Sequence, residues 1–558
     1  MKKSVVKNLV GGFVVATSLF LGGVVASAES KEVMITYNNE EGRQYVLDTS
    51  EKIKKDLKHL GAFIAVVDDE DIPSLQKHKD IEDVSENKGF TVQIPEKDLK
   101  GNAIKAGGSN FSEASSWNET NAWHIKYTHI ESAWSKGFTG KGVKVAIMDT
   151  GIAKHPELTI KGGVSFVSTE KTYEDFDGHG THVAGIVGAK RNGYGAVGIA
   201  PDAELYAVKV LDGNGRGTLF AVAEAMEWAI ANDMDIVNLS LSSQVTLNVL
   251  EKVVKRAIAQ DIVVVAAAGN RGAPTGENIS SVSYPALFND VIAVSSIHDS
   301  GTISSFSSRG PKVEVSAPGY SVYNTHLDNT YASMSGTSMA SPVVAGLIAV
   351  LKEQYPHYTS EELRLELQKH VVDAGTPGRD NLYGYGTVRY DASKNATLFH
   401  PITNEPMSAV LASLEKAVSN AEKNKTRNNY AVAKDLLQNA MRTKDTAVYK
   451  ERLDKMRSQS AVSSENAIQK LKQNLSLSQY QALVNGNKNL LDQEDVKAYT
   501  DQARVYEGML EFRASFNLAQ AKRTKSTHSI NLAQKAINEV PDATMRGKLQ
   551  TQLNNLKK

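Results

Sequence analysis

Three separated residues in this chain have side chains that could together carry out nucleophilic catalysis. Asp149 ends a short apolar run, His179 follows a glycine-containing turn, and Ser338 begins a long apolar segment. A serine hydroxyl is a weak nucleophile and needs a base within hydrogen-bonding reach. Imidazole can act as that base, and a carboxylate can orient it and stabilise its cationic form. We therefore expect Ser338 to be the nucleophile, His179 its base and Asp149 the orienting carboxylate.

Two other interpretations use some of the same residues. Asp149 lies in an Asp-Thr-Gly segment, as in aspartic proteases, and Asp299 in Asp-Ser-Gly could be its partner. That interpretation leaves the segment around Ser338 without a role. His182 lies one helical turn after His179, a spacing that could bind a metal, although we expect His182 to be a packing residue.

The order of these segments, Asp then His then Ser, resembles the subtilisin family of serine proteases. A fourth motif, Ala-Ala-Gly-Asn ending at Asn270, lies where that family keeps its oxyanion asparagine. The resemblance covers residues 119–395 and implies a secreted serine endopeptidase made as a self-processing precursor. It also implies that Asn270 and the backbone N–H of Ser338 donate hydrogen bonds to the oxyanion.

The resemblance further implies where a peptide substrate binds. The substrate would add as a β-strand between residues 214–217 and 240–242. The chain departs from the family at three serines that stand where glycine is usual. If their hydroxyls face the pocket for the P1 side chain, that pocket is small and polar. The substrate-binding residues implied are Arg216, Gly217, Ser240, Leu241, Ser242, Ser243 and Ser283, of which the last three are the departures.

The chain has no cysteine, so neither disulfides nor zinc bound by thiolates can stabilise it. In the subtilisin family the loop after the histidine helix binds Ca²⁺ through carbonyl and amide oxygens. Hard oxygen donors of this kind suit calcium, so we expect a structural Ca²⁺ ion, although two basic residues in the loop oppose it. The ligand positions implied are Glu119, Glu157, Lys190, Asn192, Tyr194 and Ala196.

Short and almost entirely apolar runs separate the segments that hold these residues. Strands that are apolar on both faces are typical of a mostly parallel sheet with helices on both faces. We therefore expect residues 119–395 to form an α/β, subtilisin-like catalytic domain. The strands are expected at residues 143–148, 204–210, 236–241, 262–267 and 291–294.

Residues 1–28 have the pattern of a secretory signal peptide. Lysines precede an apolar run that ends in Ala-Ser-Ala at residue 28. A membrane anchor is the alternative, but glycines interrupt the run and no second run is long enough to cross a bilayer. We therefore expect an extracellular protein without a transmembrane anchor.

Residues 29–98 have a β-α-β-β-α-β pattern, which predicts a ferredoxin-like α+β domain with helices at 50–60 and 72–79. This segment resembles the inhibitory propeptide of subtilisins, so the chain's own propeptide is an expected intramolecular inhibitor. Residues 99–118 contain several glycines and serines and are interpreted as a linker containing or near the maturation site.

Residues 400–558 are expected to form an all-α C-terminal region. From residue 401 onward this region holds 25 Lys and Arg against 16 Asp and Glu, a net charge of +9 in a chain whose total is zero. A weak repeat pairs Ala421, Tyr430, Ala433, Leu437 and Leu453 with Ala521, Ile530, Ala533, Ile537 and Leu549.

The basic charge of this region suggests anionic cell-wall polymers as its partner, although a solvated helical surface would look the same. For the whole chain we expect protein or peptide substrates, no nucleic acid, and an extracellular location that could include the cell wall. A surface-binding protein with a vestigial protease is the alternative from another class, but every expected catalytic position is intact.

Overall fold

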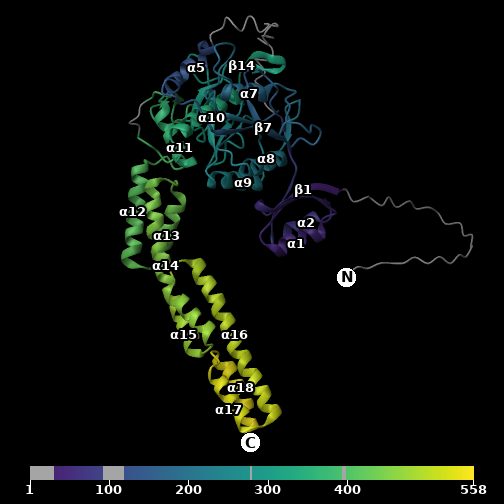
Figure 1. The fold of residues 1–558 in the computed structure, drawn as a ribbon, viewed down its shortest axis with the longest axis vertical. Coiled ribbons are helices and arrows are strands. Elements are labelled where there is room, and N and C mark those ends of the chain that lie inside the picture. The colour runs from purple at the N-terminus through teal and green to yellow at the C-terminus, as the bar shows by residue number, and fades with distance from the viewer. Residues whose placement is uncertain (1–29, 92–118, 277–278, 393–396, 558) are drawn as a thin grey trace, which may run out of the picture. The chain divides into compact units, whose positions relative to one another are not determined.

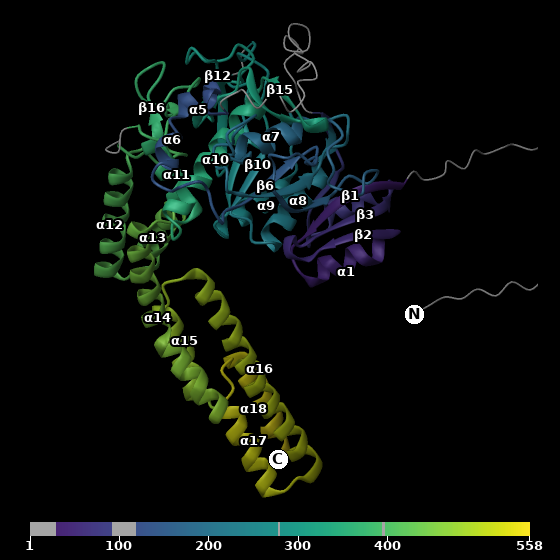
Figure 2. The same cartoon turned by 45° about the horizontal axis from the view of Figure 1, so that its top comes forward.

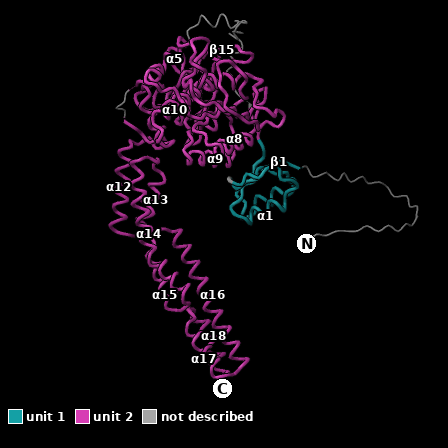
Figure 3. Tube along the Cα trace, viewed as in Figure 1, with its two compact units in different colours: residues 1–87 teal, residues 88–558 magenta. Residues whose placement is uncertain are grey.

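The computed structural model describes residues 30–91, 119–276, 279–392 and 397–557. The expected signal peptide, 1–28, and linker, 99–118, therefore lie outside the described residues. The chain forms two compact units, residues 1–87 and residues 88–558 (Figure 3).

The first unit is a four-stranded antiparallel sheet with two helices. The strands lie in the order β2-β3-β1-β4, as a ferredoxin-like arrangement requires. One face buries an apolar core that includes Val33, Ile35 and Phe63. The elements are β1 (Ser30–Tyr37), α1 (Glu40–Thr49), β2 (Lys52–Leu57), η1 (Lys58–Leu60), β3 (Ala62–Asp68), α2 (Ile72–Lys77) and β4 (Ile81–Glu86).

The helix expected at residues 50–60 is wrong. The first helix, α1, comes earlier, beginning after the cap residue Asn39, whose side chain accepts from the backbone N–H of Gly42. Residues 52–57 form β2 instead, paired with β3 around a bulge. Ile53 and Leu57 are four residues apart, a spacing compatible with a helix, and the ladder with β3 overrides that local pattern.

A nine-stranded sheet forms the centre of the second unit, in the order β16-β17-β13-β12-β11-β10-β6-β8-β7. All neighbouring strands are parallel except β16 and β17. The five strands expected from the sequence are therefore confirmed. The strands are β6 (Lys144–Asp149), β7 (Ile160–Ser165), β8 (Glu204–Lys209), β10 (Ile236–Leu239), β11 (Val263–Ala267), β12 (Ile292–Ile297), β13 (Val315–Pro318), β16 (Val371–Val372) and β17 (Thr387–Val388).

Helices cover this sheet (Figures 1 and 2). α10 (Thr337–Gln354) packs on β10 to β13, and α7 (His179–Gly188) packs on β6 and β8. Alternate residues of β6, Val145 and Ile147, join the core beneath these two helices. α8 (Leu219–Ala231) packs on β6 and α9 (Asn248–Ala259) on β11, beside each other.

The smaller elements of the second unit lie around this sheet. β5 and β9 form one two-stranded ladder, and β14 and β15 form another. These elements are β5 (Gly89–Thr91), η2 (Glu119–Asn121), α5 (Trp123–Thr128), α6 (Glu131–Trp134), β9 (Arg216–Thr218), β14 (Val322–His326), η3 (Leu327–Asn329), β15 (Thr330–Met334), α11 (Ser360–Leu367) and η4 (Gln368–His370).

The C-terminal region is helical, as expected. None of the helices in the described part of the chain is long and apolar enough to cross a membrane. The helices are α12 (Met407–Asn424), α13 (Arg427–Asn439), α14 (Lys444–Gln473), α15 (Leu477–Gly486), η5 (Asn487–Asn489), α16 (Gln493–Thr524), α17 (Thr527–Asn538) and α18 (Ala543–Leu556).

These helices form three copies of one unit, in which a long helix is followed by a short helix and then by the start of the next long helix. The short helices α13, α15 and α17 are capped by Thr426, Ser476 and Ser526, which are spaced fifty residues apart. Buried positions repeat with the same spacing: Leu414, Ser464 and Ala514; Val418, Ile468 and Leu518; Ala421, Leu471 and Ala521; Ala433, Leu483 and Ala533; and Ala440, Leu490 and Val540. The pairing seen in the sequence joined the first copy to the third and missed the middle one.

Candidate active site

Asp149 is the last residue of β6, which lies between β10 and β8 in the sheet. Its side chain is fully buried. One carboxylate oxygen, Oδ1, accepts from the backbone N–H of Thr150 at 2.7 Å and lies 2.7 Å from Nδ1 of His179. The sheet thus fixes a buried carboxylate at the carboxyl ends of its strands and aims it at the histidine.

His179 is the first residue of α7 and is also buried. The start of this helix is held by Asp175. Its Oδ1 accepts from the N–H groups of Asp177 and Gly178, at 2.9 and 3.0 Å. Its Oδ2 accepts from the N–H and hydroxyl of Thr181, at 2.9 and 2.6 Å. Asp175 therefore positions the helix, and with it the imidazole, and the sequence analysis did not identify it.

Two opposing effects act on the charge of His179. Burial lowers the pKa of the imidazole, whereas the charge and hydrogen bond of Asp149 raise it, assisted by Asp177 and Asp175. The outcome is a pKa above the ordinary value. The site therefore favours the imidazolium ion that forms when a base takes a proton.

Ser338 is the second residue of α10, the helix that follows Gly336. Two hydrogen bonds of opposite direction join Ser338 to Ser240, the residue that follows β10. The Ser338 hydroxyl donates to the carbonyl of Ser240 at 3.2 Å, and the Ser240 hydroxyl donates to the carbonyl of Ser338 at 2.8 Å. In this arrangement the nucleophile candidate is bonded to the backbone rather than to His179, and catalytic hydrogen bonds often tighten only when substrate binds.

The amide of Asn270 has a fixed orientation. Its Oδ1 accepts from the N–H and the hydroxyl of Thr337, at 2.9 and 3.0 Å. A Cβ atom built on Gly336 would lie 3.3 Å from Nδ2 of Asn270 and 3.6 Å from the N of Ser338. The space left by the glycine is therefore bordered by two N–H donors, which is the arrangement that stabilises an oxyanion.

Of the expected substrate-binding segments, the one that begins at Ser240 bonds directly to Ser338. Arg216 and Gly217 belong to β9, and the antiparallel partner of β9 is β5. Ser240, Leu241 and Ser242 follow β10 and are buried. An extended segment of the chain, β5, thus pairs with one of the two segments expected to bind substrate.

The serines that depart from the family lie on two segments that are hydrogen-bonded to each other. Ser243 and Tyr284 exchange two backbone hydrogen bonds of 2.9 Å, and the N–H of Ser283 donates to the carbonyl of Ala268 at 3.0 Å. The Ser283 hydroxyl accepts from Nε2 of Gln244 at 2.9 Å. The Ser243 hydroxyl instead accepts from the N–H of Val245 at 3.2 Å. Each of these two hydroxyls therefore has a partner, Ser243 within its own segment and Ser283 across to the segment of Gln244.

The six expected calcium positions are also brought together. Oε2 of Glu119 accepts from the N–H groups of Asn192 and Gly193, at 3.1 and 2.9 Å, and Oε2 of Glu157 accepts from the N–H of Ala196 at 2.9 Å. The backbone of Lys190 bonds to the carbonyl of Glu157 at 2.9 Å. Tyr194 lies in the same loop, where its N–H donates to Oδ1 of Asn192 at 3.4 Å.

The loop has the donor chemistry of a calcium site. Glu119 and Glu157 are both buried. Burial, together with the charge of Glu119, raises the pKa of Glu157 to about 7, although hydrogen bonds from Tyr331 and Ala196 oppose the shift. Among the described residues no three acidic, histidine or cysteine side chains form a metal-binding group, so a cation here would rely on two carboxylates with amide and carbonyl oxygens. A buried pair of like charges in this setting fits a divalent cation.

The alternatives do not fit the structure. Asp299 follows β12, three strands away from β6, which is about 14 Å at the usual strand spacing, and its side chain is 60% exposed. It therefore cannot pair with Asp149 as in an aspartic protease. His182 is buried with Nε2 at 3.0 Å from the carbonyls of Val322 and Ala332, which makes it a packing residue as expected.

Comparison with known proteins agrees with this geometry. A model described as the subtilase family matches residues 140–386. The minor extracellular protease Epr of Bacillus subtilis (strain 168) is 35% identical over 99% of this chain and 83% of its own length. The thermostable alkaline protease of Halalkalibacterium halodurans is 38% identical over 67% of this chain and 95% of its own. Subtilisin BL of Lederbergia lenta is 44% identical over 49% and 97%. This chain belongs to the subtilase family and is a serine endopeptidase that acts on proteins.

Proposed function

We propose that Ser338, His179 and Asp149 are the catalytic residues of this endopeptidase. The observation that carries the proposal is the 2.7 Å contact between Nδ1 of His179 and Oδ1 of Asp149, both buried. In the reaction, Nε2 of His179 takes the hydroxyl proton of Ser338 while Oγ of Ser338 attacks the peptide carbonyl. Asp149 holds the imidazole and stabilises its cation. His179 then gives the proton to the leaving amine, and water releases the acyl group by the reverse route.

Asn270 and the backbone N–H of Ser338 would hold the oxyanion formed in each step. Their donors border one space, and Oδ1 of Asn270 is engaged with Thr337, so Nδ2 is the group directed there. The peptide would lie against Arg216 and Gly217 on one side and Ser240, Leu241 and Ser242 on the other.

We propose that the chain is secreted as a precursor that cuts itself, with residues 29–98 as the inhibitor. The pairing of Gly89–Thr91 with Arg216–Thr218 supports this, since the backbone of the segment occupies the edge expected for substrate. The N–H of Leu219 also donates to the carbonyl of Lys88 at 3.0 Å. Secretion is further supported by the name of the Bacillus subtilis relative, which is an extracellular protease.

Replacing Ser338 tests both parts of the proposal. Ser338→Ala should abolish peptide hydrolysis and leave the precursor uncut, because the nucleophile for both reactions is removed. The wild-type protein, purified in the same way, should run at the mature size. Mature-sized Ser338→Ala protein, obtained without any added protease, would contradict self-processing.

Calcium binding is general among subtilisins, and we propose that the loop at 190–196 of this chain holds one structural Ca²⁺. Glu119, Glu157 and Asn192 would supply side-chain oxygens, and Lys190, Tyr194 and Ala196 backbone carbonyls. A bound Ca²⁺ would balance the two buried carboxylates and stabilise the folded form, with no part in acyl transfer.

We propose that the helical region binds anionic cell-wall polymers. Its net charge of +9 supports this. Sedimentation of the Ser338→Ala protein with purified cell walls, with and without residues 400–558, provides the test. Equal sedimentation of the two forms would contradict it.

A further inference from the structure

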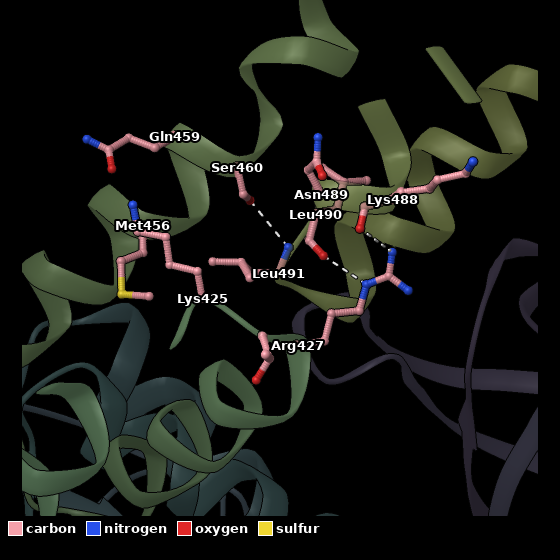
Figure 4. Close-up of a pocket in the computed structure, with 10 residues that line it drawn as sticks. Lys425, Arg427, Met456, Gln459, Ser460, Lys488, Asn489, Leu490 and Leu491 are labelled. Atoms are coloured by element: carbon pink, nitrogen blue, oxygen red, sulfur yellow. Dashed lines mark hydrogen bonds between the residues drawn. The ribbon is translucent and has the colours of Figure 1, made fainter. Parts of the chain in front are cut away.

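The helical region contains a basic pocket of about 670 Å³ (Figure 4). It lies between the α12–α13 turn, the middle of α14 and the turn before α16. Lys425, Arg427 and Lys488 line it, and no carboxylate is among the described side chains that do. Met456 and Leu491 add apolar surface. Lys425 and Lys488 lie on opposite sides of the pocket, as Figure 4 shows, so the pocket has a positive potential that favours an anion.

The cations are partly fixed in place. The guanidinium of Arg427 donates to the carbonyls of Leu490 and Asn487, both at 2.8 Å, as Figure 4 shows for Leu490. Nζ of Lys488 donates to Oδ1 of Asn485 at 3.0 Å. Within the described residues these partners are neutral oxygens, so hydrogen bonding positions the charges without neutralising them.

The repeat shows what lies at the equivalent place one copy later. There the N–H of Leu477, at the start of α15, donates to the carboxylate of Glu539. The equivalent residues lie fifty positions earlier in the chain. Leu477 corresponds to Arg427, and Glu539 corresponds to Asn489. The later copy therefore has an anion built in at a helix N-terminus, where negative charge is favoured. The pocket has a neutral asparagine in that place.

The basic residues around this place also differ between the two copies. The residues equivalent to Lys425, Arg427 and Lys488 are Leu475, Leu477 and Asn538, all neutral. The copy with the carboxylate thus lacks these three cations, although Arg513 donates to the carbonyl of Leu475 there at 2.8 Å. The copy with the three cations has no carboxylate in the equivalent place.

We propose that this pocket binds a phosphate group of an anionic wall polymer. The inference rests on the proposed wall binding of the helical region and assigns it to named residues. Phosphate carries more charge and more acceptor oxygens than a single carboxylate, which suits three cations and the amide of Asn489. The apolar atoms of Met456 and Leu491 would contact the carbon backbone of the polymer.

The test measures binding by calorimetry at fixed ionic strength, with the full-length Ser338→Ala protein as the background. Poly(glycerol phosphate) is the probe, and inorganic phosphate is the second arm. Asn489→Glu supplies the carboxylate found in the later copy and should weaken polymer binding about tenfold or more. Lys425→Gln should weaken it severalfold. Lys525→Gln is the matched control, because Lys525 holds the same left-handed position after a long helix, outside the pocket, and should have less than a twofold effect.

Three results would overturn the proposal. Equal losses with Lys425→Gln and Lys525→Gln would indicate general charge attraction instead of a pocket. Unchanged binding by Asn489→Glu, in a variant whose Tm shows that it folds, would exclude the site. Inorganic phosphate binding as tightly as the polymer would identify free phosphate as the ligand. In each case sedimentation with cell walls reports separately on the wall binding of the helical region.

Discussion

At the scale of single residues, the charge of His179 depends on carboxylates beyond Asp149. Asp177 accepts from the backbone N–H of His179 at 3.1 Å and, like Asp175, raises the pKa of the imidazole. Only neutral imidazole can take the proton of Ser338. Activity should therefore rise with pH through the pKa of His179, which lies above its ordinary value.

Asp177→Asn should move the lower limb of the kcat/KM profile to lower pH. The substitution keeps an oxygen for the N–H of His179 but removes a negative charge that favours imidazolium, so the pKa of His179 falls. Asp299→Asn removes an exposed charge elsewhere and is the control. The profile of Asp177→Asn measured beside wild type checks this, and a limb at unchanged or higher pH would contradict it.

Ser283 should restrict the P1 side chain. Its hydroxyl is fixed by Gln244 between the segments that end at Ser243 and Ala268. Ser283→Gly should raise kcat/KM for a P1 Phe relative to P1 Ala by about tenfold, because steric losses of this size correspond to about 1–3 kcal/mol. Ser243→Gly is the control, since that hydroxyl is bonded to Val245.

A matched series of peptides that differ only at P1 measures this ratio. Wild-type enzyme that prefers Phe over Ala by tenfold or more would mean that Ser283 does not limit the pocket.

At the scale of elements, the sequence predicts best where one physical requirement dominates. The central strands are apolar on both faces, and their short length distinguishes them from a buried helix such as α10, so β6, β8, β10, β11 and β12 were all predictable. β2 was not, because Ile53 and Leu57 suit a helix as well as a strand and only pairing with β3 decides between them. The catalytic motifs are local in sequence and could be identified without the fold.

Residues that act on the backbone could not be identified in this way. Asp175 bonds to three N–H groups and one hydroxyl, and the same residue type occurs at many exposed turns. The middle helical repeat was missed because Asn487 stands where its counterparts are Leu437 and Ile537. The fifty-residue period is visible in the cap positions, where only Ser or Thr is needed.

The loop at 190–196 gives a prediction that depends on both calcium and pH. The pKa of Glu157 is about 7 in the folded protein, above its ordinary value of 4.5. Between pH 4.5 and 7 the folded form therefore keeps a proton on Glu157 that the unfolded form has lost. Without Ca²⁺, this contribution is fully present below about pH 4.5 and is lost as the pH rises through 7. The loss should be roughly 1–3 kcal/mol.

Melting curves between pH 5 and 8, in EDTA and in excess Ca²⁺, test this. Wild-type Tm should fall with pH in EDTA, and Glu157→Gln should remove much of that fall. Calcium should stabilise the wild type increasingly as the pH rises, because it binds the ionised carboxylates. Identical curves with and without Ca²⁺ would remove Glu119, Glu157 and Asn192 from the ligand set.

At the scale of the whole molecule, the helical repeats and the catalytic fold belong to one compact unit. Arg442, in the turn before α14, joins them. Its Nε lies 2.6 Å from Glu361, and its other nitrogens contact Asp261 at 3.1 Å and the carbonyl of Ala259 at 3.0 Å. The N–H of Lys444 adds a bond of 2.8 Å to Glu362. A surface bound by the repeats would therefore hold the protease close to it.

The central claim is that Ser338 is a nucleophile activated by His179. Reaction of the mature enzyme with a phosphonyl fluoride, followed by peptide mass analysis, tests it most directly. The account predicts one phosphonyl group per active molecule, on Ser338, and labelling about 10²–10⁴-fold slower in His179→Ala when an added protease has removed the propeptide from both proteins. A label on another residue, or equal labelling rates in the two proteins, would contradict it.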